Sequence, residues 1–351
     1  MSRPTRVTID LRALTDNAQA LRKQAGNRKF MAVVKADAYG HGATECAHAL
    51  SEHVDAFAVA ITEEALALRS AGIEQPILVL QGPHSADDLE AAVHASLWPA
   101  ISNHDQLDWL KQSNARFEAV WIKCDTGMHR LGFSPDSVAT VRQTLASIGI
   151  RKTVLMSHLA DAEHSESTVT QRQKRAWATV TQDTKETSLS NSAGLLGRAV
   201  DNDTWVRLGY ALYGGSVSEK TLKPVMTFGS QIASIRCIEP GETVGYSGRW
   251  VAKRASRIAT IPVGYADGYP RSARDGTPIG STFGLVPLAG KVSMDMITAD
   301  ITDQPQLNVG SPVTLWGATP CIDQVASHCD TIGYELLTRI TQRVPKLFYR
   351  T

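Results

Sequence analysis

The sequence predicts an α/β protein: an N-terminal (β/α)8 barrel of the TIM type followed by a C-terminal, mostly β domain. From about residue 29 onward, short apolar runs alternate with longer segments of helical period, which is typical of parallel βα units. About eight such units in roughly 200 residues favour a barrel. An open doubly wound sheet is the alternative, but no Gly-x-Gly-x-x-Gly follows the first predicted strand, so dinucleotide binding has no support.

The barrel strands are predicted from apolar runs of the length of buried strands. These runs are Phe30–Val34, Phe57–Ile61, Ile77–Leu80, Leu97–Ile101, Ala119–Ile122, Val154–Met156, Ser188–Ser190 and Val206–Leu212. Three intervening helices open with good caps or acidic first turns: Thr62–Ala71, Ser85–Ala95 and Ser134–Ile148, the last with proline at its first position. A longer polar helix is predicted over Thr168–Asp183.

The composition changes near Leu222, so residues 1–222 and 223–351 are predicted as separate domains. Beyond this point Gly, Pro, Thr and Val dominate, and helical periodicity fades until about Cys321. Strands are predicted over Gln231–Ile238, Ser256–Val263 and Val292–Ile301. The strand-like segment Arg6–Ile9 could pair with either domain.

Composition and charge limit the classes of function. The 351 residues are 43% hydrophobic and 20% charged, which supports a large core. Since 36 basic and 35 acidic residues give a net charge of +1, we expect neither nucleic acid nor a membrane as partner. The N-terminus lacks the apolar core of a signal peptide, which predicts a cytoplasmic protein. Five scattered cysteines without Cys-x-x-Cys argue against a disulfide framework and a metal site.

The stretch Met31–Gly42 (MAVVKADAYGHG) places Lys35 where a buried strand gives way to a turn. Barrel enzymes carry out their chemistry at the carboxyl ends of strands, and partial desolvation lets a lysine lose its proton there. An ordinary surface lysine is the alternative on position alone. The string AVVKADAYGHG resembles the pyridoxal-phosphate signature of the alanine racemases, in which the matching lysine carries the cofactor.

A second stretch, Trp121–Phe133 (WIKCDTGMHRLGF), resembles the KxDTGMxRxG motif of the same family. The resemblance implies that Arg130 contacts the phenolic oxygen of the cofactor and helps to hold the substrate carboxylate. In the family the residue matching Lys123 is often carbamylated, which turns a cation into an anion that can orient the arginine. A plain ion pair between Lys123 and Asp125 is the alternative.

The family pattern implies the remaining cofactor-binding residues. The residues that bind the phosphate are Tyr39, Ser192, Gly209 and Tyr210, the last two through backbone N–H groups. Arg207 faces the pyridine nitrogen, and His158 lies between Arg207 and a catalytic tyrosine. Because arginine does not give up its proton, we expect the ring to stay neutral, which discourages transamination and decarboxylation.

The chain departs from the family pattern at two positions. Leu208 stands where the family usually has proline between the arginine and the glycine, so we expect a looser turn. Gln342 stands where some members have a tyrosine that binds the phosphate, so we expect one donor fewer.

The tripeptide Val-Gly-Tyr occurs twice in the second domain, ending at Tyr246 and at Tyr265. Either tyrosine could be a phenolic base on the residues alone. By resemblance, the catalytic tyrosine is Tyr246, which follows a Gly-Glu pair. Tyr265 is then a gate in the substrate corridor, with Arg271 near the passage. The backbone N–H of Met294, in a VxMD motif, meets the substrate carboxylate.

The resemblance therefore implies an alanine racemase that uses Lys35 and Tyr246 as its two bases and supplies D-alanine for peptidoglycan. In the family the residues matching Tyr246 and Met294 reach the barrel of the other subunit, which implies a head-to-tail homodimer. Two alternatives are other enzymes: a broader racemase that also accepts serine, and a barrel-type decarboxylase, which would need a glycine-rich loop. A non-enzymatic cofactor-binding barrel is the third, and the β domain argues against it.

Overall fold

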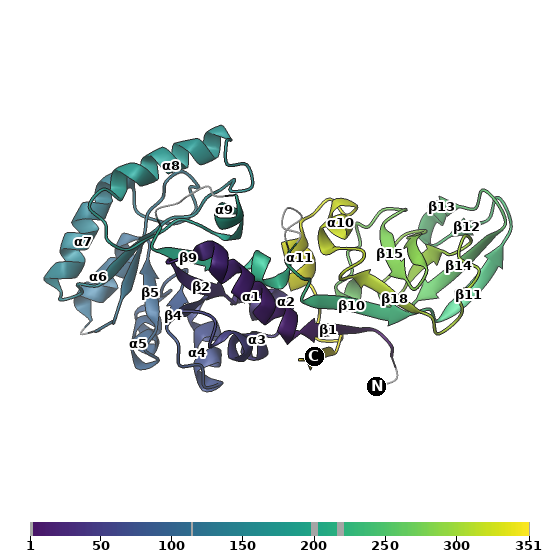
Figure 1. Cartoon of the computed structure of the whole chain (residues 1–351), viewed down its shortest axis with the longest axis horizontal. Helices are drawn as coiled ribbons and strands as arrows, with labels where there is room; N and C mark the ends of the chain where they lie inside the picture. The colour runs from purple at the N-terminus through teal and green to yellow at the C-terminus, as the bar shows by residue number, and fades with distance from the viewer. Residues whose placement is uncertain (1–2, 114, 198–202, 216–220, 351) are drawn as a thin grey trace. The chain divides into compact units, whose positions relative to one another are not determined.

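The computed structural model describes residues 3–113, 115–197, 203–215 and 221–350. It divides into two compact units (Figure 1). The barrel unit comprises residues 15–38 and 43–212, and the β unit comprises residues 1–14, 39–42 and 213–351. The β unit thus includes the N-terminal strand and a short piece of chain just after Lys35.

The described part of the barrel unit contains an eight-stranded parallel sheet in the order β8-β7-β6-β5-β4-β3-β2-β9. The strands are β2 Lys29–Val33, β3 Ala56–Val59, β4 Ile77–Val79, β5 Trp98–Ile101, β6 Val120–Lys123, β7 Thr153–Met156, β8 Thr187–Ser188 and β9 Trp205–Leu208. The N–H of Thr204 donates to the carbonyl of Thr187 at 3.1 Å, and that of Arg207 to Ser190 at 3.0 Å. These bonds link the last two strands, so the predicted barrel is confirmed.

Helices cover the outer side of the barrel strands (Figure 1). They are α1 Leu11–Ala25, which begins in the β unit, α3 Ala43–Leu50, α4 Thr62–Ser70, α5 Ala86–His94, α6 His104–Gln112, η1 Pro135–Ser137, α7 Val138–Ser147, α8 Thr168–Val180 and α9 Ser192–Leu196. The helix predicted from Ser134 is correct in place but begins with the 3-10 turn η1. Among the described residues, none of the helices is long and apolar enough to cross a membrane.

Three tryptophans fill the barrel at the amino ends of its strands, away from the carboxyl ends. The ring centroids of Trp121 and Trp205 lie 5.5 Å apart, and those of Trp98 and Trp205 5.7 Å apart. The indole N–H of Trp205 donates to Glu186 at 2.7 Å. The indole N–H of Trp121 is buried and has no hydrogen-bond partner in the described part of the chain. The three tryptophan rings therefore form a packed layer of the barrel core, which stabilises the barrel.

We expect Trp205→Phe to lower the free energy of unfolding by about 1 kcal/mol more than Trp121→Phe does. Both changes remove the same ring volume, but only Trp205→Phe breaks a hydrogen bond, whereas Trp121→Phe removes a buried group that lacks a partner. Urea unfolding of the two variants measures the difference. An equal or larger loss in Trp121→Phe would contradict this assignment.

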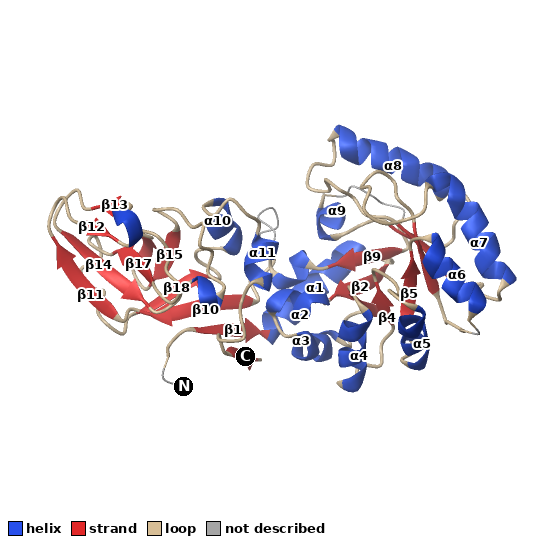
Figure 2. Cartoon of the chain, turned by 180° about the vertical axis from the view of Figure 1, so that it is seen from behind, coloured by secondary structure: helices blue, strands red, loops and turns tan. Residues whose placement is uncertain are grey.

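The β unit is built from two sheets and a hairpin, and strands dominate it (Figure 2). One sheet has the order β16-β15-β18-β10-β1-β19 and the other β11-β14-β17. Its strands are β1 Arg6–Asp10, β10 Met226–Gln231, β11 Ser234–Ile238, β12 Thr243–Val244, β13 Trp250–Val251, β14 Ser256–Ile261, β15 Pro278–Ser281, β16 Gly284–Pro287, β17 Ile297–Asp300, β18 Pro312–Trp316 and β19 Lys346–Tyr349; its helices are α10 Ile322–Ser327 and α11 Gly333–Thr338. Strand β1 pairs with β10 and β19, so the N-terminal strand belongs to this unit.

Two strand predictions in this unit are wrong in extent. The segment Gln231–Ile238 is split, because the N–H of Ile232 bonds to Ser311 and that of Ala233 to Thr260, which moves the chain from one sheet to the other. Only the second half of Val292–Ile301 is a strand, since the first half forms a loop. In the barrel unit, likewise, the run Val206–Leu212 ends as a strand at Leu208, and the 3-10 helix η2 Tyr210–Tyr213 follows.

Candidate active site

Lys35 stands at the carboxyl end of β2, at the start of the segment α2 Lys35–Gly40. This segment is a left-handed helical turn: φ is 52° at Ala36, 54° at Asp37, and 53° at Ala38 and Tyr39. L-residues disfavour this conformation by about 1–2 kcal/mol each, so a run without glycine is uncommon. Backbone strain of this kind concentrates at functional sites.

The surroundings of Lys35 lower the pKa of its amine. Burial, and then the positive charge of Arg130, lower the pKa of Lys35; the carboxylate of Glu64 raises it, and Arg207 lowers it further. The net direction is downward, because removing a cation from water and surrounding it with other cations favours the neutral amine.

Lys123, the last residue of β6, belongs to the same cationic group. Burial lowers the pKa of Lys123 to about 8, with further lowering by Arg207, Arg130 and Lys35 and an opposing effect of Asp125. Arg130 has an exposed side chain and lies in the loop after β6. The Asp125 carboxylate shapes this loop by accepting the N–H groups of the three residues that follow Thr126.

Arg207 is buried in β9 and is held by the ends of two neighbouring strands. Its guanidinium donates to the carbonyl of Ser188 at 2.9 Å and to that of Ser157 at 2.6 Å, and it lies 3.4 Å from Nδ1 of His158. Burial lowers the pKa of Arg207 to about 10, while Asp203 opposes this shift. Arg207 therefore keeps its proton near neutral pH.

His158 is neutral in this setting. Burial, followed by the charges of Arg207 and Lys123, lowers the pKa of His158 well below its ordinary value. When Nδ1 accepts a bond from Arg207, the single proton of the neutral ring lies on Nε2. Gln173 holds the backbone on the outer side, because its side-chain amide donates to the carbonyl of His158 at 2.8 Å.

Asp203 is a site residue that sequence reasoning missed. Its Oδ2 accepts the N–H groups of Leu189 at 2.8 Å and Ser190 at 2.7 Å, and it is buried. Asp203 thus fixes the chain between Ser188, which binds Arg207, and Ser192. The residue lies outside every predicted strand, and no signal in the sequence pointed to it.

Backbone N–H groups converge at the start of α9 and η2. The N–H of Gly209 donates to Oγ of Ser192 at 3.1 Å, and the N–H of Ala211 donates to the same oxygen at 3.3 Å. Tyr210 is buried between them at the first position of η2. N–H groups that meet on one oxygen make a cradle suited to an oxyanion such as a phosphate.

The other predicted site residues lie in the β unit. The ring centroid of Tyr39 lies 5.1 Å from that of Tyr213 and 6.0 Å from that of Tyr334. Burial raises the pKa of the Tyr39 hydroxyl. Tyr246 is 69% exposed and Met294 is 52% exposed.

The turns that carry Tyr246, Tyr265 and Met294 meet along one segment. A Cβ on Gly245 would lie 3.2 Å from the backbone N of Lys291, so the turn of Tyr246 packs closely against that residue. The N–H of Tyr265 donates to the carbonyl of Ser293 at 3.1 Å, and the N–H of Ala266 donates to that of Met294 at 3.0 Å.

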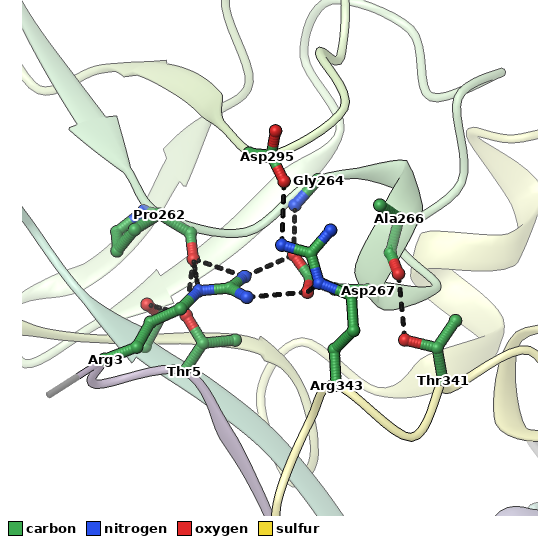
Figure 3. A network of polar contacts seen from close by, with 10 residues as sticks. Arg3, Thr5, Pro262, Gly264, Ala266, Asp267, Asp295, Thr341 and Arg343 are labelled. Atoms are coloured by element: carbon green, nitrogen blue, oxygen red, sulfur yellow. Dashed lines mark hydrogen bonds and ion pairs between the residues drawn. The ribbon is translucent and has the colours of Figure 1, made fainter. Parts of the chain in front are cut away.

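A buried carboxylate anchors the Tyr265 turn (Figure 3). Asp267 is 0% exposed; it accepts a bond from Arg3 at 2.8 Å and the N–H of Gly264 at 2.9 Å. Arg343 lies 3.4 Å from Asp267 and also donates to Asp295 at 2.7 Å. The N-terminal and C-terminal segments are therefore both tied to this turn.

We expect Arg3→Met to lower the free energy of unfolding by about 2–3 kcal/mol, because it leaves the buried charge of Asp267 with one cation fewer. Arg6→Met, at an exposed position on the same segment, is the control and should cost less than about 0.5 kcal/mol. Chemical denaturation compares the two. Similar losses in both variants would show that the Arg3–Asp267 pair does not stabilise the unit.

Two domain models of one family match successive parts of the chain. The family model "Alanine racemase, N-terminal domain" matches residues 9–217, and "Alanine racemase, C-terminal domain" matches residues 225–348. The chain belongs to the alanine racemase family.

Individual proteins agree with this assignment. The chain is 45% identical to an alanine racemase of Chromohalobacter salexigens, over 99% of this chain and 98% of that protein. Its fold matches the biosynthetic alanine racemase of Pseudomonas aeruginosa with a TM-score of 0.95 and 39% identity, over 99% of this chain and 100% of that one. It matches the Bartonella henselae alanine racemase with covalently bound pyridoxal phosphate with a TM-score of 0.89 and 31% identity, over 99% of both chains.

The barrel residues fit the cofactor of this family. Lys35 supplies an amine of lowered pKa, Arg207 supplies positive charge for an anionic, phosphorylated ring, and the cradle at Ser192 supplies donors for an oxyanion. Leu208 forms the last ladder position of β9, opposite Ala32, so the missing proline leaves the strand intact. Among the described residues, no group of three or more His, Cys, Asp or Glu side chains could hold a metal ion.

Proposed function

We propose that this chain interconverts L-alanine and D-alanine with pyridoxal phosphate as cofactor. The observation that carries the proposal is the placement of Lys35, in a chain of the alanine racemase family. The lysine ends a barrel strand on a strained left-handed turn, and burial among cations lowers its pKa. A lysine in this state suits both cofactor attachment and proton transfer.

The proposed cofactor site uses residues of the barrel unit together with Tyr39. Lys35 holds the cofactor, and Arg207 faces its ring nitrogen. The phosphate is bound by Ser192, the N–H groups of Gly209 and Tyr210, and Tyr39. When bound, pyridoxal phosphate weakens the Cα–H bond of an attached amino acid by conjugation.

Two bases on opposite faces of Cα move the proton. Lys35 takes or returns it on one face, and Tyr246 does so on the other. Arg207 keeps its own proton, because its pKa of about 10 lies well above neutral pH. It therefore donates a hydrogen bond without passing a proton to the ring, which favours racemisation over decarboxylation. Nδ1 of His158 lies 3.4 Å from the guanidinium of Arg207, so His158 is proposed to link Arg207 to the catalytic tyrosine.

The proposed substrate contacts follow the family pattern. Arg130 and the backbone N–H of Met294 hold the carboxylate of alanine, and Tyr265 gates its access with Arg271 nearby. Gln342, exposed beside Arg343, adds no phenolic donor to the phosphate.

We propose that Lys123 is carbamylated. The neutral amine adds carbon dioxide and releases a proton, and the resulting anion faces Arg130. With a pKa of about 8, roughly one lysine in ten is neutral at pH 7, far more than for an ordinary lysine. We expect a carbamate signal in ¹³C NMR after labelling with ¹³C-bicarbonate, and its loss in Lys123→Ala. A wild-type spectrum without that signal would rule out the modification.

We propose that the active enzyme is a homodimer in which Tyr246 and Met294 of one subunit complete the barrel site of the other. Their exposure in the β unit supports this, since large exposed apolar groups mark contact surfaces. Mixing inactive Lys35→Ala and Tyr246→Phe chains should restore about a quarter of the wild-type activity, because each mixed dimer has one intact site. No recovery after subunits have exchanged would contradict shared sites.

The substrate class is tested with L-alanine, L-serine and L-lysine in parallel. We expect D-alanine to form fastest by chiral chromatography, without release of carbon dioxide. Faster D-serine formation would favour a broader racemase, and released carbon dioxide would favour a decarboxylase. The proposed cellular role is cytoplasmic supply of D-alanine for peptidoglycan, which predicts that the gene restores growth of a bacterium that requires D-alanine.

A further inference from the structure

The carboxylate of Glu64 joins the start of helix α4 to the peptide that follows Lys35. Its Oε1 accepts the N–H of Ala36 at 2.6 Å, and its Oε2 accepts the N–H of Ala60 at 2.7 Å. The N–H of Ile61 lies 3.4 Å from the same Oε2. One side chain thus caps α4 and holds the first residue of the left-handed turn.

The left-handed turn needs partners of this kind. Four successive residues that are not glycine have φ between 52° and 54°, a conformation that persists only where the surroundings enforce it. The carboxylate of Asp37 accepts the N–H of Ala43 at 2.8 Å, and the N–H of Ala38 donates to Val34 at 2.9 Å. These two contacts are local, whereas Glu64 reaches the turn from the next βα unit.

We propose that Glu64 is the positioning residue for Lys35: through the N–H of Ala36 it holds the left-handed turn and so fixes where the Lys35 side chain leaves β2. The inference rests on the proposed role of Lys35, and it adds a residue that acts through Lys35 without contacting the substrate. From the sequence, Glu64 is predicted only as part of the acidic first turn of the helix over Thr62–Ala71.

The charges around Lys35 predict how a change at Glu64 alters the pKa of Lys35. Arg130 and Arg207 lower the pKa of Lys35, Glu64 raises it, and Lys123 and His158 share the same cluster. Removing the charge of Glu64 should therefore lower the pKa of Lys35 further. If the substitution only opened the site to water, the pKa of Lys35 would instead rise, because exposure returns a buried lysine toward its ordinary pKa.

The test compares Glu64→Gln with Glu63→Gln in the full chain supplied with pyridoxal phosphate. Glu63 is exposed in the same first turn of α4, so both changes remove one charge at the same helix terminus. In Glu64→Gln we expect amide hydrogen exchange at Ala36–Tyr39 to quicken about tenfold, as for the loss of one charge-assisted hydrogen bond. Glu63→Gln should leave exchange there unchanged.

A second readout follows the pH dependence of pyridoxal phosphate binding by absorbance, because the attached amine must be neutral. We expect the midpoint in Glu64→Gln to fall by at least about half a pH unit. A midpoint that is unchanged or higher would overturn the inference, as would equal exchange rates in the two glutamine variants.

Ala36→Gly provides a rescue, since glycine adopts the left-handed conformation without strain. Ala36 is exposed, so we expect this change to raise Tm alone and to slow amide exchange again in the Glu64→Gln background. Ala178→Gly, at an exposed position of right-handed helix α8, should lower Tm. A fall of Tm in both glycine variants would contradict the role of the turn.

The proposed function and this inference can fail separately. A wild-type chain that racemises alanine while Glu64→Gln behaves like Glu63→Gln overturns the positioning role alone. A wild-type chain that forms no D-alanine, but shows the expected exchange rates and midpoint, overturns the proposed function and supports the geometry around Lys35.

Discussion

Replacing Lys35 with alanine is expected to lower kcat/KM for alanine racemisation by about 10⁴-fold or more, because the change removes both the proposed cofactor attachment and one of the two proposed bases. The loss should appear in both directions, from L-alanine and from D-alanine, since the same amine is needed for either. Chiral chromatography of both reactions measures it, and absorbance reports whether the cofactor is still held.

Lys29→Ala is the matched control for this change. Lys29 begins strand β2, which ends at Val33, and the ion pair of Lys29 with Glu186 at 3.1 Å is partly exposed. We expect kcat/KM to stay within about twofold of wild type and stability to fall by less than about 1 kcal/mol. A Lys35→Ala chain that keeps more than a hundredth of the wild-type rate would refute the role of Lys35.

Replacing Tyr246 with phenylalanine is expected to slow racemisation by about 10²–10⁴-fold, the range for loss of one general base. Lys35 is unchanged in this variant, and by the proposal its amine still exchanges the Cα proton on its own face. In heavy water, deuterium should therefore enter one enantiomer of alanine and not the other. Mass spectrometry of each enantiomer measures this asymmetry.

Tyr265→Phe separates the two tyrosines that sequence alone left as alternatives. It keeps both proposed bases and removes only the hydroxyl of the proposed gate, so we expect a change in KM and symmetrical deuterium uptake. If Tyr265→Phe showed the one-sided uptake and Tyr246→Phe did not, the catalytic base would have been assigned to the wrong turn.

The barrel was predictable because its signals are local. Short apolar runs mark the strands. The start of the helix at Ser85 was predicted from the sequence Ser-Ala-Asp-Asp, and in the structure the hydroxyl of Ser85 accepts the N–H of Asp88. The second domain was predicted only in outline, since its chain changes sheets at Ile232 and Ala233, where long-range bonds override a continuous β pattern.

The residues that support the site were not predictable in the same way. Glu64, Asp203 and Asp267 are acidic residues whose partners are distant in sequence or belong to the backbone, so each resembles an ordinary solvated carboxylate. The left-handed turn also escaped prediction, because Ala36, Asp37 and Ala38 carry no glycine signal. Lys35 itself was found through its place after a strand and through its family motif.

Racemisation by the wild-type chain in heavy water tests the proposed function most directly. The purified chain with pyridoxal phosphate is mixed with L-alanine, and D-alanine is followed by chiral chromatography and mass spectrometry. We expect rapid formation of D-alanine that carries deuterium at Cα, and its loss in Lys35→Ala. Bound cofactor without D-alanine, or D-alanine formed equally fast by Lys35→Ala, would contradict the assignment of this chain as a two-base alanine racemase.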